Sequence, residues 1–255
     1  MAVAPQIVVA HDGETWANEA ASILLSACEA AIQSRGRCLL ALSGGSTPRT
    51  LYAALTSDQW RNRFDWSKIF FLFGDERCVP PDHHDSNFGT ARLALFQPLN
   101  IREDHIFRMR GEDRDPQAAV RDYESVLRRL TTCAPPDLPR LDVILLGVGD
   151  DGHTASLFPG TAALHENSRA VTVGLAPTGI RSRLTLTLGV LNRASVILFL
   201  VTGAQKAPVV RRILSPQSEA DRTLPAALVA PDHGRLIWVM DRSAASQLPV
   251  HNLVV

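Results

Sequence analysis

One loop of this sequence combines a glycine pattern with side chains that can exchange protons. The glycines of 147-GVGDDGHT-154 are spaced as GxGxxG after an apolar run, which is the pattern of a loop that binds the pyrophosphate of a dinucleotide. The same loop carries Asp150, Asp151 and His153. Carboxylates beside an imidazole indicate general acid–base chemistry instead. The loop therefore allows two different functions.

Three features of the sequence argue against the dinucleotide. Asp150 and Asp151 would place two negative charges beside an anionic pyrophosphate. Pro159 and Gly160 end any following helix after about two turns, which is short for a crossover helix. The next predicted strand, 170-AVTVGLA-176, has no acidic residue that could bind a ribose hydroxyl. We therefore predict that the protein binds no cofactor.

The acid–base interpretation makes His153 the central residue. An unperturbed histidine has a pKa of roughly 6.5, so it is mostly neutral and can accept a proton at pH 7. A carboxylate beside the ring can hold its tautomer and stabilise the imidazolium. Asp151 can do this if the turn brings the two side chains together. In the alternative, Asp151 caps a short helix beginning near Thr154, and His153 is a buried hydrogen-bond donor.

The loop 43-SGGSTP-48 follows a predicted strand and opens a predicted helix. Thr47 suits the N-cap position and Pro48 the first helical position. The hydroxyls and approachable N–H groups at the positive end of a helix suit a phosphate monoester, and a Walker A sequence is absent. A plain strand-to-helix turn is the alternative. The candidate phosphate ligands are Ser43, Gly44, Gly45 and Ser46.

Three further groups could bind an anion or a metal ion. Lys206 lies near the start of a predicted helix and Arg183 on a predicted strand, and either cation could reach the same phosphate. Taken singly, each is more often a solvated surface charge. The run 82-DHHD-85 suggests a metal, but adjacent histidines lack the i,i+4 spacing of helical zinc ligands. We predict no metal site.

Short apolar runs alternate with helical patterns along the chain, which indicates an α/β fold with a parallel sheet covered on both faces. Ligands of such sheets lie beyond the carboxyl ends of the strands, so the loops after the second, third, fourth and sixth strands matter most. Arg183–Leu188 alternates polar and apolar residues and could be an additional strand. The predicted strands are Gln6–Ala10, Cys38–Leu42, Ile69–Phe73, Asp142–Leu146, Ala170–Val173, Ser195–Val201 and Leu236–Met240, and the predicted helices are Glu14–Gln33, Pro48–Leu55, Asn87–Phe96, Pro116–Thr131 and Ala204–Leu214.

Composition excludes several classes of partner. The 255 residues include 26 basic and 26 acidic side chains, so no bulk positive field attracts nucleic acid or anionic lipid. The four cysteines form no CxxC pair and suit reduced thiols of a cytosolic protein. No signal peptide or membrane span is recognisable. We expect one domain over residues 1–255, located in the cytoplasm, and the sequence does not indicate an oligomeric state.

Six segments carry a resemblance to a known family. They are 42-LSGGSTP-48, 74-GDERCVPPDHHDSN-87, 145-LLGVGDDGHTASLFPG-160, 183-RLTLTLGVLN-192, 202-TGAQK-206 and 224-LPAALV-229. Taken together, they resemble the 6-phosphogluconolactonase family, within the broader group that includes glucosamine-6-phosphate isomerases/deaminases. The resemblance covers the chain from about residue 40 to 240. It implies a Rossmann-like three-layer α/β/α sandwich, no cofactor, and hydrolysis of 6-phospho-D-glucono-1,5-lactone, the second step of the oxidative pentose phosphate pathway.

The resemblance also implies roles for individual residues. His153 would be the base that activates water, with Asp151 beside it at the lactone, and Asp75 and Arg77 would line the pocket. The phosphate would be held by the loop beginning at Ser43, with charge supplied by the two cations named above. Arg77 or glycine-loop N–H groups are candidates for stabilising the oxyanion.

One departure separates the two branches of this group. The isomerase/deaminase branch has a glutamate five residues after the histidine, where this chain has Phe158, and an apolar ring cannot shuttle a proton. This difference favours the lactonase. A third hypothesis, a phosphosugar-sensing domain of a transcriptional regulator, is disfavoured because strand-like sequence begins at Gln6 and leaves no room for a helix-turn-helix.

Overall fold

The structure, a computed structural model, describes residues 4–249. Its strands and helices alternate along most of the chain. The strands are β1 (Gln6–Ala10), β2 (Cys38–Leu42), β3 (Ile69–Phe73), β4 (Asp75–Arg77), β5 (Val143–Leu146), β6 (Val171–Leu175), β7 (Ser182–Leu186), β8 (Val196–Val201) and β9 (Arg235–Asp241). The α-helices are α1 (Gly13–Arg35), α2 (Ser46–Leu55), α3 (Asn87–Ala91), α4 (Pro116–Thr131), α5 (Leu188–Asn192), α6 (Ala207–Leu214) and α7 (Glu219–Arg222).

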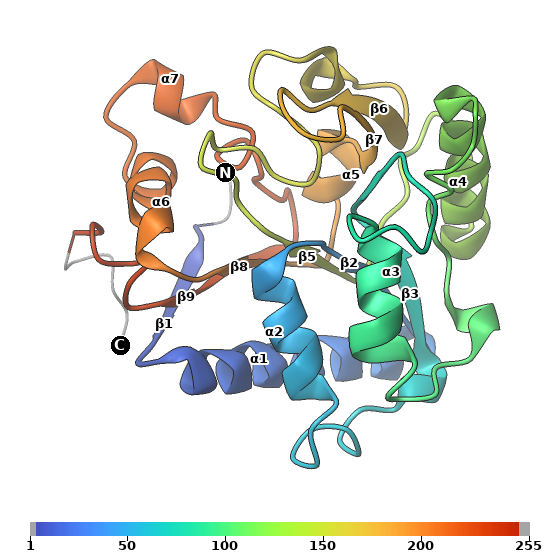
Figure 1. Ribbon diagram of the computed structural model, residues 1–255, viewed down its shortest axis with the longest axis horizontal. Coiled ribbons are helices and arrows are strands. Elements are labelled where there is room, and N and C mark those ends of the chain that lie inside the picture. Colours follow the sequence, from blue (N-terminus) through green and yellow to red (C-terminus); the bar gives the residue numbers. More distant parts are fainter. Residues whose placement is uncertain (1–3, 250–255) are drawn as a thin grey trace.

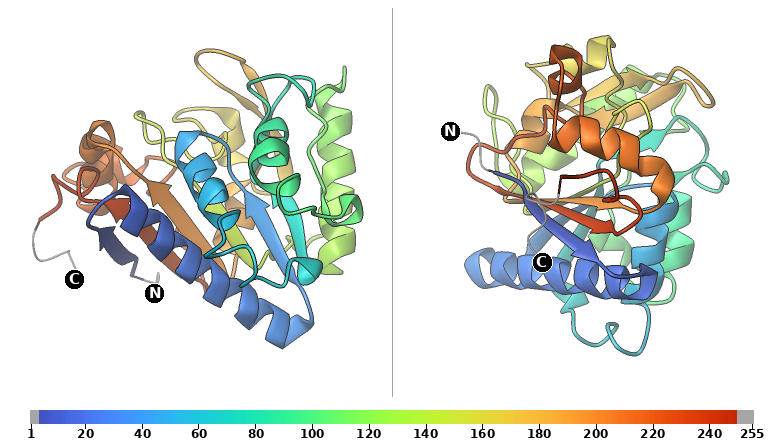
Figure 2. Two further views of the ribbon diagram at one scale, coloured as in Figure 1. Left: turned by 60° about the horizontal axis from the view of Figure 1, so that its bottom comes forward. Right: turned by 90° about the vertical axis from the view of Figure 1, so that its left-hand side faces the viewer.

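Six strands form one sheet in the order β1-β9-β8-β5-β2-β3, and all their pairings are parallel. Strands β2, β5 and β8 are buried along their whole length, as expected of central strands covered on both faces. Helices α1, α2 and α3 lie on one side of the sheet, and α6 and a second, smaller sheet on the other (Figures 1 and 2). The predicted three-layer sandwich with a mostly parallel sheet is confirmed.

The longest helix shows how the sequence builds these layers. Helix α1 begins after Asp12, whose carboxylate accepts the N–H of Thr15 at 2.8 Å, and it ends at Gly36, which adopts a left-handed conformation with φ 74°. Its buried face includes Trp16, whose indole N–H donates to the carbonyl of Val239 in β9 at 2.9 Å. The helix is thereby joined to the sheet by apolar packing and by one buried hydrogen bond.

The second sheet was not predicted. It is antiparallel, in the order β4-β7-β6, and it takes up segment 170–173, which we had assigned to the parallel sheet. That assignment was wrong because residues 176–181 alone connect β6 to β7, whereas a parallel crossover needs about a dozen or more residues. The extra strand proposed at Arg183–Leu188 is confirmed as β7, which begins one residue earlier and ends two residues earlier than predicted. β4 is short and charged, so no apolar pattern marked it.

Several element boundaries also differ from the prediction. Helix α2 begins at Ser46 with Gly45 as its N-cap, so the assignment of Thr47 to that position was wrong. The hydroxyl of Thr47 is instead hydrogen-bonded to that of Thr202 at 2.9 Å, which ties two loops together. The segment 204–214 divides into a 3₁₀ turn and α6, and α3 continues into a π-helical turn over 92–96. Helices α5 and α7 were not predicted.

Within residues 4–249, none of the helices combines the length and the apolar character that a membrane span requires.

Candidate active site

The four loops singled out from the sequence meet at the carboxyl edge of the parallel sheet. Together with β7 and the segment 176–178, they line an open pocket of about 320 Å³. Two predicted site residues, Ser46 and Asp151, do not line this pocket. The predicted residues that do are Ser43, Gly44, Gly45, Asp75, Arg77, His153, Arg183 and Lys206.

His153 and Asp151 form the pair that the sequence could only suggest. His153 Nδ1 lies 2.6 Å from Asp151 Oδ1, and the main-chain N–H of His153 donates to the same oxygen at 3.1 Å. Burial of Asp151 opposes its ionisation, but these hydrogen bonds outweigh it and hold the pKa of the carboxyl below its usual value. A carboxylate that accepts from Nδ1 leaves Nε2 of the neutral ring as the proton acceptor.

The glycines of this loop make room for that pair. A Cβ at Gly149 would overlap Nδ1 and Cε1 of His153 and would lie 2.7 Å from Asp151 Oδ1. The N–H groups of Gly149 and Gly152 donate within the loop, to the carbonyls of His153 and Gly149, both at 2.9 Å. They are therefore not directed at a pyrophosphate. Residues 150–161 contain no helix, so the alternative in which Asp151 caps one near Thr154 was wrong.

Phe158 supports the imidazole from one side. Its ring centroid lies 4.4 Å from that of His153, at an interplanar angle of 40°, and it lines the same pocket. The position at which the isomerase/deaminase branch has a glutamate is thus filled by an apolar contact with the candidate base.

Asp75 is held more tightly than the sequence suggested. The residue is 7% exposed; its Oδ1 accepts from Asn87 Nδ2 at 3.0 Å, and its Oδ2 accepts from the Ser156 hydroxyl at 2.6 Å. Both oxygens are therefore engaged, which suits a residue that positions its neighbours. Asn87 and Ser156 were not predicted as site residues, because in the sequence only their polar side chains set them apart from their neighbours.

Glycine at position 44 is required by the same network. A Cβ there would overlap the side-chain amide of Asn87, with Nδ2 at 2.9 Å. That amide also donates to the main-chain carbonyl of Asp75 at 2.9 Å. Asn87 therefore packs the phosphate-loop candidate 43–48 against β4.

The buried carboxylate of Glu76 anchors the loop beyond β4. It accepts the main-chain N–H groups of Arg77, Asn87 and Phe88 at 2.7–2.8 Å and the Ser86 hydroxyl at 3.1 Å. Burial nevertheless raises the pKa of this carboxyl, since the hydrogen bonds only partly offset desolvation. The start of α3 is in this way fixed relative to the pocket.

Two guanidinium groups come from neighbouring strands. Arg77 and Arg183 are directly opposite each other in the β4–β7 ladder. Arg77 Nη1 donates to the carbonyl of Asp85 at 2.5 Å, and Arg183 Nε donates to that of Ile180 at 2.7 Å. Burial, together with the charge of Arg77, lowers the pKa of the Arg183 guanidinium. Two repelling cations at one pocket wall favour binding of an anion.

The third cation, Lys206, is held by the glycine loop itself. Its Nζ donates to Asp150 Oδ1 at 2.6 Å, and the lysine side chain is 23% exposed while that of Asp150 is 75% exposed. Lys206 lines the pocket, and the ion pair with Asp150 holds its ammonium beside the glycine loop. The sequence placed both residues in loops after strands, but their pairing depends on the adjacency of β5 and β8 in the sheet.

Comparison with known proteins identifies the family. The sequence profile described as glucosamine-6-phosphate isomerases/6-phosphogluconolactonase matches residues 11–238. The chain belongs to this family. It is 39% identical over 228 residues to a 6-phosphogluconolactonase of Nostoc sp., covering 89% of this chain and 92% of the relative, and 40% identical to the Homo sapiens 6-phosphogluconolactonase, covering 85% and 83%. The solved 6-phosphogluconolactonase from Trypanosoma cruzi superposes with a TM-score of 0.83 at 29% identity, covering 97% of this chain and 98% of that one.

Proposed function

We propose that this chain hydrolyses 6-phospho-D-glucono-1,5-lactone to 6-phospho-D-gluconate, the second step of the oxidative pentose phosphate pathway. Relatives that match most of the chain carry the name 6-phosphogluconolactonase. The observation that carries the proposal is the His153–Asp151 pair, whose imidazole faces a pocket with Arg77, Arg183 and Lys206 on its walls. A base and several cations in one pocket suit an ester that also bears a phosphate.

In the proposed mechanism, His153 Nε2 takes a proton from water as the water attacks the lactone carbonyl. Asp151 stabilises the imidazolium through Nδ1. Collapse of the tetrahedral intermediate breaks the bond between the carbonyl carbon and the ring oxygen, and the imidazolium returns the proton to that oxygen. The products are the free hydroxyl and the carboxylic acid of the open chain, and the acid then releases its remaining proton to solvent to give the carboxylate. General base catalysis of this kind contributes about 10²–10⁴-fold.

The developing oxyanion needs a donor, and Arg77 is the proposed one. Its guanidinium donates to the carbonyl of Asp85, and Arg77 lines the same pocket as His153. Such a donor contributes about 3–4 kcal/mol to transition-state stabilisation. Asp75 orients this wall of the pocket through Asn87 and Ser156 and has no proton-transfer role in the proposal.

The phosphate is assigned to the loop between β2 and α2, which lines the pocket. Ser43, Gly44 and Gly45 offer hydroxyl and N–H groups where β2 gives way to α2, and Ser46 opens that helix. Arg183 and Lys206 supply charge for the dianion. The small-molecule phosphosugar lactone is the proposed partner, with no nucleic acid partner.

Two broader proposals concern the chain as a whole. We propose that residues 1–255 form a single domain, because the residues of both sheets contribute to one hydrophobic cluster. A cytoplasmic location is also proposed, and four free cysteines support it.

The test is the rate at which freshly generated lactone disappears, with and without protein, at slightly acidic pH where spontaneous hydrolysis is slow. The wild type should exceed the background rate greatly, and His153→Ala should lower kcat by about 10²–10⁴-fold while still binding 6-phosphogluconate. His165→Ala, at an exposed position outside the pocket, is the matched control.

Each alternative has its own readout. Release of ammonia from glucosamine 6-phosphate would indicate the isomerase/deaminase branch. Binding of phosphosugar without turnover by the folded wild type would indicate a sensor. Undiminished turnover in His153→Ala would refute the proposed base.

A further inference from the structure

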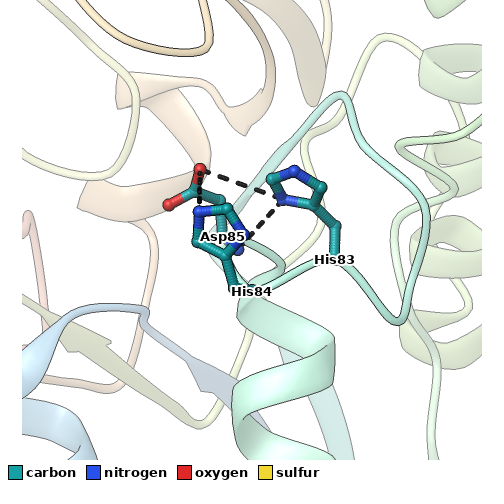
Figure 3. Close-up of side chains that lie close together, drawn as sticks. All are labelled: His83, His84 and Asp85. Carbon is teal, nitrogen blue, oxygen red and sulfur yellow. Dashed lines mark hydrogen bonds and ion pairs between the residues drawn. The ribbon is translucent and has the colours of Figure 1, made fainter.

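The loop that joins β4 to α3 brings three ligating side chains together on the surface (Figure 3). His83, His84 and Asp85 each offer one ligand atom, and these atoms all lie within 4.8 Å of one another. Asp85 Oδ2 lies 3.8 Å from His83 Nδ1 and 3.4 Å from His84 Nε2. The two imidazole rings stack with centroids 4.2 Å apart at an interplanar angle of 29°.

These separations are close to those of a coordinated ion. Zinc binds imidazole nitrogen and carboxylate oxygen at about 2.0–2.2 Å, so tetrahedral ligand atoms lie roughly 3.3–3.5 Å apart. The pair His84–Asp85 already has this spacing. His84 is exposed, and its side chain can rotate into position without disturbing the core.

The backbone of the loop is already ordered around these residues. The N–H of His83 donates to the carbonyl of Pro80 at 3.0 Å, and the N–H of Ser86 donates to the carbonyl of His83 at 2.9 Å. His83 Nδ1 accepts the N–H of Asp85 at 3.1 Å, so this nitrogen is unprotonated as a metal ligand must be. A bound ion would accept the lone pair of His83 Nδ1 in place of this hydrogen bond. The main-chain N–H of Asp85, which lies in a half-exposed loop, would then donate to water.

We propose that His83, His84 and Asp85 bind a divalent transition-metal ion of the zinc type, with water completing the coordination. Two imidazoles and one carboxylate suit Zn²⁺, Co²⁺ or Ni²⁺, whereas Mg²⁺ and Ca²⁺ prefer oxygen ligands only. Adjacent positions in sequence argued against this site, because the helical i,i+4 rule was the criterion. In the structure, the turn at 80–86 brings the three ligand atoms together without helical spacing.

The ion would act on the loop and not on the reacting atoms. None of the three ligands lines the pocket of the candidate active site. Asp85 is connected to it through its main-chain carbonyl, which accepts from Arg77 Nη1 at 2.5 Å. The bound ion would therefore cross-link residues 83–85, and the carbonyl of Asp85 in this segment holds the Arg77 guanidinium. The proposal is independent of the activity proposed above.

The experiment is calorimetric titration of chelator-treated, full-length protein with ZnCl₂, repeated with CoCl₂ and MgCl₂. The wild type should bind one equivalent of Zn²⁺, give the visible absorption of tetrahedral or five-coordinate Co²⁺, and show no heat with Mg²⁺. His84→Ala should weaken Zn²⁺ binding at least about tenfold. His233→Ala, another exposed histidine, is the control and should leave binding unchanged.

Hydrogen exchange provides a second, local measurement. Zn²⁺ should slow exchange of the amides of residues 82–86 in the wild type and not in His84→Ala. Equal affinity of wild type and His84→Ala, binding lost equally in His233→Ala, or Mg²⁺ binding as tightly as Zn²⁺ would each overturn the assignment. So would the absence of saturable one-to-one binding.

Discussion

Replacing Gly149 by alanine tests whether the glycine loop exists to accommodate the His153–Asp151 pair. The new methyl group would lie 2.7 Å from Asp151 Oδ1 and closer still to the imidazole, whereas ordinary van der Waals contact begins at 3.4 Å. The ring must therefore withdraw by about 1 Å, and a misplacement of that size reduces rates about 100-fold. This corresponds to about 2.7 kcal/mol of transition-state stabilisation.

The fold should tolerate the same change. The His153 side chain is 32% exposed and can move toward solvent, and Gly149 does not have the positive φ that penalises alanine. We expect a nearly unchanged melting temperature beside the loss in kcat for lactone hydrolysis. Gly13→Ala is the control outside the pocket, since its Cβ would also meet nothing within 4 Å. Wild-type kcat in folded Gly149→Ala, or an equal loss in Gly13→Ala, would refute the reasoning.

Three further predictions concern the surroundings of the base. In steady-state assays, Arg183→Met should raise the KM for the phosphorylated lactone much more than the KM for glucono-1,5-lactone. The control is Arg181→Met, at an exposed position outside the pocket, which should change neither KM. Asn87→Asp removes two hydrogen bonds to Asp75 and should lower the free energy of unfolding, measured by urea titration, by about 1–3 kcal/mol. If the variant is as stable as the wild type, these hydrogen bonds do not support the fold as argued. Because the folded pKa of Asp151 lies below its ordinary value of 3.8, its contribution to stability is complete above that value and is lost as pH falls through the lower folded pKa. The difference in free energy of unfolding between wild type and Asp151→Asn should therefore shrink as the pH falls below 3.8 and the carboxylate is protonated, and a difference that acid leaves unchanged would contradict the assignment.

Much of the parallel sheet could be predicted because its strands are continuous apolar runs. β2, β5 and β8 are buried throughout. Apolar runs that alternate with helical patterns are compatible with few structures other than buried parallel strands. The position of the site followed from the same argument, since ligands bind beyond the carboxyl ends of parallel strands. The sequence alone predicts that Ser43 and His153 lie at this edge of the sheet.

The antiparallel sheet could not be predicted in the same way. β4 is the three-residue segment Asp75–Arg77, whose charges mask any strand pattern, and β6 is only partly buried. Their pairing with β7 depends on contacts between distant segments, and it is this pairing that places Arg77 opposite Arg183.

The sequence by itself determined which chemical groups stand at the ends of which strands, because apolar periodicity and glycine punctuation are local properties of the chain. The tertiary structure alone decided which of those groups meet. Asp150 pairs with Lys206 because β5 and β8 are neighbours, and Asp75 in β4 is held by Ser156 in the segment that follows β5. Side-chain convergence depends on distances between segments far apart in the chain, and those distances are set by the packing of the sheets and helices.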